Sequence, residues 1–199
     1  LAWGEIAPWD VLAAARDRPG SEAFIRQVLW REFAAQTLWH APRMPDAPLQ
    51  PAFARFPWVR DGRVLDAWRR GRTGVPLVDA AMRELWATGS MPGRARMVAA
   101  SFLAKNLLQP WQDGQRWFWE ALVDADLASN AFNWQWVAGC GTDAAPFFRV
   151  FSPLAQAEKH DPSGAYTARW APCPAPPPIV DPKASRARAL AAFRAARRS

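Results

Sequence analysis

The sequence predicts an all-α domain, and three observations support this. Apolar residues recur at helical spacing in several segments, no segment shows a sustained strand-like alternation, and prolines and glycines separate the helical stretches. The chain has 199 residues, of which half are hydrophobic and 22% are charged. This composition suffices for one domain with a sizeable core and excludes a wholly disordered chain.

The first expected helix covers residues 22–39, where Ser21 can serve as the N-cap. Its apolar stripe comprises Phe24, Val28, Leu29 and Phe33. Four prolines within residues 41–56 predict a loop. A short polar helix is expected at residues 66–70.

The clearest helical pattern covers residues 73–89. Thr73 is its expected cap, Pro76 falls in its first turn, and Gly89 ends it. Further helices are expected at residues 94–108 and 115–123. The buried stripe of the first of these comprises Met97, Ala100, Ala104, Leu107 and Leu108.

The C-terminal part changes in composition. Residues 172–178 are rich in proline and should be extended. Residues 181–199 are basic and rich in alanine, so we favour a terminal helix over a solvated tail. We therefore expect a helical domain at residues 1–171, followed by a proline-rich segment and a basic helix or tail at residues 172–199.

The formal net charge is +7 and almost all of it comes from arginine, which suits an anionic partner such as DNA. A GC-rich genome would also enrich arginine. Two cysteines form neither a disulfide framework nor a zinc pattern, so we expect no metal and a cytoplasmic monomer. The N-terminus does not resemble a signal peptide, and no apolar run approaches the roughly 20 residues of a membrane helix.

Two arginines and two carboxylates form the first candidate site. Arg94 and Arg96 open one helix, whereas Asp124 and Asp126 follow another helix in an expected short loop. Arginine and carboxylate form strong bidentate pairs, which could hold a charged ring of a cofactor. A simple surface ion pair is the alternative.

Amides and indoles form the other candidates. Asn130 and Asn133 could offer a ligand both a donor and an acceptor, although an Asn in a loop is more often a turn residue. Gln27 and Trp30 share a helical face and could stack on and read a base, or could belong to the core. The 13 tryptophans include Trp134, Trp111 and Trp58, which could relay an electron if they lie close together. Hydrolase motifs such as G-x-S-x-G, H-E-x-x-H and the P-loop are absent.

Several segments, taken together in their order, resemble the flavin-binding domain of class I DNA photolyases and cryptochromes. The segments are WREF (30–33), GRTGVPLVDAAMRELWATG (71–89), RARMVAASFLAKNLL (94–108), DADLASNAFNWQWVAGCGTDAAPFFRVFSP (124–153) and GAYTARWAP (164–172). The resemblance extends to the C-terminal tail and thus covers nearly the whole chain. It implies FAD as the cofactor and light-driven splitting of cyclobutane pyrimidine dimers that are flipped out of DNA.

The resemblance also implies a role for each candidate residue. Near the flavin it places Phe24, Arg96, Asp124, Asp126 and Asn130, with Asn130 beside N5. It implies an electron relay outward from the flavin through Trp134, Trp111 and Trp58. For the dimer and the DNA it implies Gln27, Trp30, Arg31, Arg94, Met97, Trp136 and Gln156.

The sequence departs from the family in two respects. Where the family has His-Asn, this chain reads Pro92-Gly93, so the asparagine of the lesion pocket is replaced by a residue without a side chain. Leu1 follows the point at which the family has its antenna domain and phosphate-binding loop, so we expect neither here. A cryptochrome-type signalling flavoprotein and a non-catalytic remnant that binds nucleic acid by charge therefore stay open as alternatives.

Overall fold

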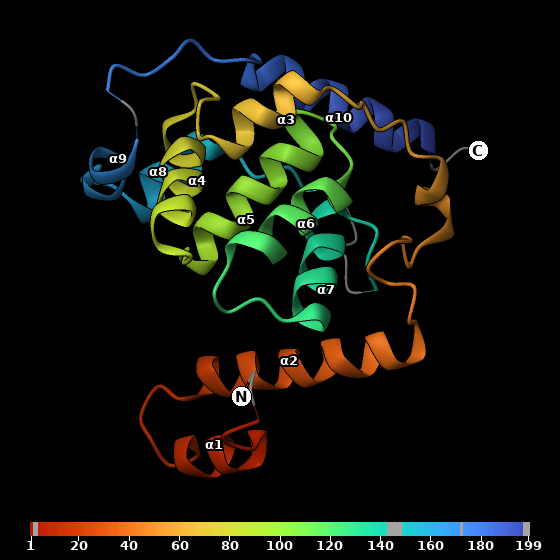
Figure 1. Ribbon diagram of the computed structural model, residues 1–199, viewed down its shortest axis with the longest axis vertical. Coiled ribbons are helices and arrows are strands. Elements are labelled where there is room, and N and C mark those ends of the chain that lie inside the picture. The colour runs from red at the N-terminus through yellow and green to blue at the C-terminus, as the bar shows by residue number, and fades with distance from the viewer. Residues whose placement is uncertain (2–3, 143–148, 172, 197–199) are drawn as a thin grey trace.

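The computed structural model describes residues 1, 4–142, 149–171 and 173–196, and it contains helices and no strand within these ranges, which confirms the all-α prediction. The helices pack around α5 and α6, with α3 and α10 along one side and α2 along the opposite side (Figure 1). In chain order they are α1 (Pro8–Ala15), α2 (Glu22–His40), η1 (Pro51–Arg55), α3 (Gly62–Arg69), α4 (Pro76–Thr88), α5 (Gly93–Ser101), η2 (Phe102–Asn106), α6 (Trp111–Ala121), α7 (Leu127–Ala138), α8 (Pro153–His160), α9 (Ala165–Trp170) and α10 (Pro182–Ala196).

The centre of the fold is the segment that joins α5 to α6. Every residue from 98 to 111 is buried, including the polar side chains of Ser101, Lys105, Asn106 and Gln109. The α-helix changes to a π-helical turn at Phe102, and Leu108, with φ of 55°, reverses the chain ahead of Pro110. The single helix expected at residues 94–108 is therefore two elements, with four of its five stripe residues buried and Met97 partly exposed.

Helix α10 packs on this central segment, so the expected terminal helix is confirmed for residues 182–196. Ala189 is fully buried in the main core. The side chain of Asn106 donates to Ser185 Oγ at 2.8 Å, and Arg188 donates to the carbonyl oxygen of Asn106 at 2.7 Å. The basic face of the tail thus contributes specific contacts to the fold.

Helix α2 packs against α7 through a smaller second core, and α1 lies beyond α2 (Figure 1). The members of this core are Ala34, Met44, Ala128, Ala131 and Phe132. The loop after α2 is held by Gln135, which accepts from the Leu49 amide at 2.8 Å and donates to the carbonyl oxygens of Met44 and Ala47 at 2.7 and 2.8 Å.

The first turns of two helices differ from the prediction. Helix α3 begins at Gly62 rather than residue 66, because the Asp61 carboxylate accepts from the amides of Arg63 and Val64. Thr73 does not cap α4, which starts at Pro76. The carboxylate of Asp79 instead accepts from the amide and hydroxyl of Thr73 at 2.7 and 2.6 Å.

Asp124 and Asp126 lie in the expected short loop, and the residues that follow this loop form α7. Asp126 Oδ1 accepts from the Ser129 amide at 2.8 Å and caps α7, which ends at Ala138 before the left-handed Gly139. Asn130 and Asn133 are therefore helix residues, and the turn interpretation is wrong. The short helices α1, α8 and α9 were not expected from the sequence, since six to eight residues give little periodicity.

Candidate functional site

A cavity of about 690 Å³ lies between α2, α5, α6 and α7. Three of these helices expose polar side chains at its rim, and α6 contributes only apolar side chains. The cavity is of the size that proteins use for small-molecule cofactors. Most of the predicted site residues line it, namely Gln27, Trp30, Arg31, Arg94, Arg96, Met97, Asp124, Asp126, Asn130, Trp134 and Trp136.

An ion pair between the start of α5 and the approach to α7 marks the polar rim. Arg96 Nη2 donates to Asp124 Oδ2 at 2.9 Å, and Arg96 Nε donates to the carbonyl oxygen of Met91 at 2.8 Å. The second bond fixes the plane of the guanidinium, so the carboxylate is held in one place. The predicted pairing of these two residues is confirmed.

Two further polar residues of this rim are held by the start of α7. Asp126 uses one carboxylate oxygen as the helix cap, which leaves the other oxygen for a ligand. Asn130 Nδ2 donates to the carbonyl oxygen of Gln115 on α6 at 2.9 Å, which turns the amide and leaves its oxygen Oδ1 for a donor. The rim therefore presents acceptor atoms on a short stretch of chain.

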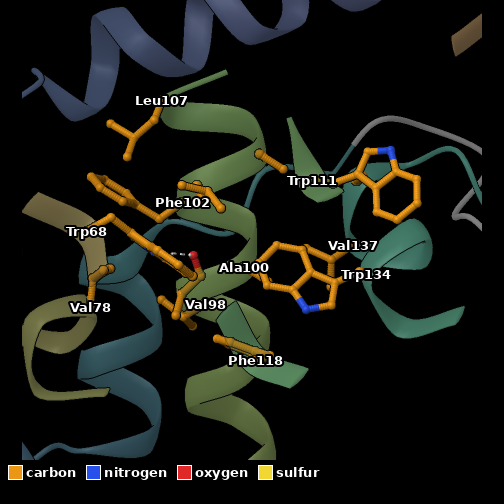
Figure 2. Packing of buried hydrophobic residues seen from close by; sticks show 14 of the residues in the cluster. Trp68, Val78, Val98, Ala100, Phe102, Leu107, Trp111, Phe118, Trp134 and Val137 are labelled. Carbon is orange, nitrogen blue, oxygen red and sulfur yellow. Dashed lines mark hydrogen bonds between the residues drawn. The ribbon is translucent and has the colours of Figure 1, made fainter. Parts of the chain in front are cut away.

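Trp134 forms the apolar wall below this rim. It lies edge-on to Phe118 and Trp68, with ring centroids 4.9 and 6.2 Å apart (Figure 2). Its indole N–H is buried and has no hydrogen-bond partner, in a residue that lines the cavity. Helix α6 can approach this ring so closely only because Gly114 lacks a side chain; a Cβ atom there would overlap the Trp134 ring and Leu103.

Further aromatic rings line the cavity. Trp30, on α2, is 41% exposed and lies 6.1 Å from Phe132 and 5.7 Å from Phe33 between ring centroids. Trp136 projects from α7 and contacts Phe151 at 6.5 Å. A planar ligand could therefore be enclosed between indoles.

The two arginines expected to bind DNA differ in their surroundings. Arg94 is exposed at the cavity rim. Arg31 donates to Glu32 at 2.6 Å and to the carbonyl oxygen of Leu1 at 3.3 Å, so an acidic neighbour already compensates its charge. Arg94 is thus the better placed of the two for a phosphate.

Four predicted residues lie outside the cavity lining. Phe24 is 51% exposed and faces a shallow depression between α1 and α2, and Gln156 is on α8. Trp111 is fully buried in the main core with Trp134, and Trp58 packs against the same core. The bond from the Val59 amide to the Leu108 carbonyl oxygen, 2.7 Å long, brings residue 58 to the end of the segment that leads into Trp111.

Several cavity residues were not singled out for the site from the sequence. They are Ala100, Phe118, Leu122, Ala125, Ser129, Phe132 and Val137, whereas Gly93 and Asn133 were expected there. Helical spacing from Asp126 onward would have placed Ser129 and Asn133 on one stripe with Trp136, but a loop was expected there.

Within the described ranges, no cluster of His, Cys, Asp or Glu side chains is arranged to hold a metal ion. The helices in these ranges also include none with the length and apolarity needed to cross a membrane.

Comparison with known proteins agrees with this architecture. Residues 24–176 match the model of the FAD-binding domain of DNA photolyase. A deoxyribodipyrimidine photo-lyase of Thermus thermophilus is 48% identical over 189 residues, which make up 93% of this chain and 44% of that protein.

Two solved structures extend the comparison. A class III photolyase from Agrobacterium tumefaciens superposes with a TM-score of 0.91 at 41% identity, covering all of this chain and 48% of that one. A cryptochrome from Synechocystis superposes with a TM-score of 0.85 at 30% identity, covering 99% and 47%. The chain thus spans a little under half the length of these relatives. It belongs to the family of FAD-binding domains of DNA photolyases.

Proposed function

We propose that this chain is the flavin-carrying part of a light-dependent DNA lyase that splits cyclobutane pyrimidine dimers. The observation that carries the proposal is the shared cavity. Its lining combines the acceptor rim and Trp134 with the exposed indole of Trp30 and with Trp136 and Arg94. A flavin and a flipped-out pair of bases would then meet in one enclosed space.

FAD is the cofactor named for this family of domains, and the residues of the cavity fit its ring system. The acceptors of Asp126 and Asn130 suit the N–H groups of a flavin edge, and the Arg96–Asp124 pair suits a ring whose charge changes. The unpaired N–H of Trp134 and the apolar residues around it suit the flat face of the ring.

When bound, FAD supplies the light absorption and the electron that opens the dimer. The protein residues then position and shield the reacting groups. Arg96, fixed by two hydrogen bonds, holds the rim rigid. Asn130, which is oriented by Gln115, would offer its carbonyl oxygen to a protonated nitrogen of the ring. The aromatic walls exclude water, which strengthens each of these interactions.

We propose the electron relay through Trp134, Trp111 and Trp58 as a second part of this function. It is supported by the location of all three indoles in or against one hydrophobic core, with burial decreasing from Trp111 to Trp58. Figure 2 shows Trp134 and Trp111 on the same side of the helix that carries Phe102. Illumination with an external thiol should reduce bound flavin, and Trp134→Phe should slow this reduction strongly.

Repair is the direct test of the proposed function. The flavin-loaded, reduced protein is illuminated with an oligonucleotide that contains one thymine dimer, and the dimer is quantified by chromatography. We expect light-dependent loss of the dimer and none in the dark. Retained flavin without any loss of dimer would contradict a repair function.

A cryptochrome-type signalling function is the second candidate, and Gly93 favours it. This residue lines the cavity where the family has an asparagine, and nothing lies within 4 Å of the position that a Cβ atom would take there. Signalling would need photoreduction through Trp134 without dimer binding. Two results together would support this alternative. Photoreduction of the flavin would be abolished in Trp134→Phe, and the wild-type protein would bind damaged and undamaged DNA equally.

A charge-only nucleic-acid-binding remnant predicts a protein that binds no flavin and binds DNA with a steep salt dependence. Its net charge of +7 allows such binding.

We also propose that the protein acts in the reducing cytoplasm, which the free thiols of Cys140 and Cys173 support.

A further inference from the structure

Asn133 is an exposed amide in the cavity to which the resemblance assigns no role. Its Nδ2 atom donates to the carbonyl oxygen of Ser129, one turn earlier on α7, at 2.8 Å. This bond uses one of its two N–H groups and fixes the orientation of the amide. The oxygen Oδ1 and the second N–H are then presented together on a side chain that lines the cavity.

Asn133 lies in the middle of the side of α7 that faces the cavity. At 100° per residue, it falls about 60° from Trp136 in one direction and about 60° from Asn130 in the other, and about 100° from Trp134. Asn133 is therefore a neighbour of both Asn130 and Trp136 on the helix surface that lines the cavity.

A second amide faces the same space from another helix. Gln27, on α2, is exposed and also lines the cavity, one turn before Trp30. Trp30 contacts Phe132, the neighbour of Asn133, at 6.1 Å between ring centroids. The cavity thus combines a stacking indole with two amides supplied by opposite helices.

Amides that present a donor and an acceptor side by side match the edge of a pyrimidine, where a ring N–H lies beside a carbonyl oxygen. Two linked pyrimidines have two such edges, and the structure offers two amides. Gly93, on the adjacent helix α5, leaves space at the rim for an edge to reach Asn133, since nothing lies within 4 Å of the position of a Cβ atom there.

We propose that Asn133 is a specificity-determining residue that recognises the Watson–Crick edge of one pyrimidine of the dimer, with Oδ1 accepting from the N3–H group and the free N–H donating to a carbonyl oxygen. This inference rests on the proposed function. It adds a recognition element on α7, which compensates for the missing side chain at Gly93.

The test measures binding in the dark, so that it does not depend on repair. Fluorescence anisotropy compares an oligonucleotide that contains one thymine dimer with the undamaged oligonucleotide. Asn133→Ala should weaken dimer binding roughly tenfold, as expected for one bidentate contact, and should leave undamaged binding unchanged. In Asn133→Ser the hydroxyl can keep a hydrogen bond to the Ser129 carbonyl oxygen, so the helix is preserved while the amide is removed. This variant should lose nearly as much affinity for the dimer as Asn133→Ala does.

Two controls make the result specific. Gln36→Ala removes an exposed amide of α2 that does not line the cavity, and it should have no effect. A dimer methylated at one N3 position or the other removes the proposed donor. Wild-type protein should lose affinity for one of these two dimers, whereas Asn133→Ala should show no further loss with that dimer.

The outcomes separate this inference from the proposed function. If wild-type protein prefers the dimer and both Asn133 variants show the same preference, the role of Asn133 is overturned but the proposed function is not. Wild-type protein that binds both oligonucleotides equally overturns the proposed repair function and this inference with it. A specific loss in both variants that is absent in Gln36→Ala supports the proposal.

Discussion

At the scale of single residues, small and polar side chains decide the shape of the site more than large ones do. The indole of Trp134 can reach its place only beside a residue without a side chain, and Asn130 points correctly only because Gln115 offers a carbonyl oxygen. Trp134 and Asn130 were expected at the site from the sequence. Their partners Gly114 and Gln115 were not, since nothing in a sequence shows which backbone a distant side chain meets.

Gly114→Ala should destabilise the protein by about 1–3 kcal/mol, because the added methyl group overlaps the Trp134 ring and Leu103 in a closely packed core. Urea denaturation measures this change. Gly62→Ala is the matched control, since open space surrounds that position at the start of α3. An unchanged midpoint for Gly114→Ala would show that the two helices are less tightly packed than described.

Lys105 should make stability depend on pH. Burial lowers the pKa of Lys105 to about 7, whereas the unfolded chain keeps a value near 10.5. Between these values the unfolded state binds more protons, so the free energy of unfolding should rise as the pH increases from about 7 to about 10, on the order of 2 kcal/mol.

The measurement compares urea denaturation curves of wild type and Lys105→Met at several pH values in this window. The variant should lack the rise in stability, and the exposed Lys159→Met should retain it. Equal pH dependence in wild type and Lys105→Met would contradict the buried environment of this ammonium group.

At the scale of elements, helix ends and connecting loops determine how the cavity is built. Long periodic segments such as 22–39 and the glycine stop at residue 89 were predicted correctly, because periodicity and C-cap chemistry are local. The start of α4 and the whole of α7 were misjudged. At the start of α4 the carboxylate of Asp79 accepts from the backbone amide of Thr73, and at the start of α7 the carboxylate of Asp126 accepts from that of Ser129. The sequence alone does not show which carboxylate will bind which backbone amide.

Gln135 should be the residue that fixes the loop after α2. Gln135→Leu leaves one partly buried amide and two carbonyl oxygens without partners, so we expect a loss of about 2–4 kcal/mol in the free energy of unfolding. Gln112→Leu removes a single exposed bond to the same loop, at Asp46, and should cost less than about 1 kcal/mol. Similar costs for the two variants in chemical denaturation would argue against this role.

At the scale of the whole molecule, one helical body surrounds a cavity that is lined by both aromatic and polar side chains. The all-α class, the family and most of the cavity lining followed from the sequence, because the motifs that carry the resemblance are the segments that meet at the cavity. The orientation of the individual amides did not follow. Asn130 and Asn133 lie one turn apart on α7 and both line the cavity, but each is turned by a different carbonyl oxygen, that of Gln115 for Asn130 and that of Ser129 for Asn133.

The central claim is that this cavity holds the flavin, and the amount of FAD bound per chain tests it most directly. The visible absorbance of bound flavin is measured for wild type and for Ala100→Trp, in which a large ring would fill the cavity from the buried wall of α5. Circular dichroism confirms that both proteins keep their helices. We expect wild-type protein to take up about one FAD per chain and Ala100→Trp to take up almost none. A wild-type protein that stays colourless in excess FAD, or equal uptake by the two proteins, would contradict the account.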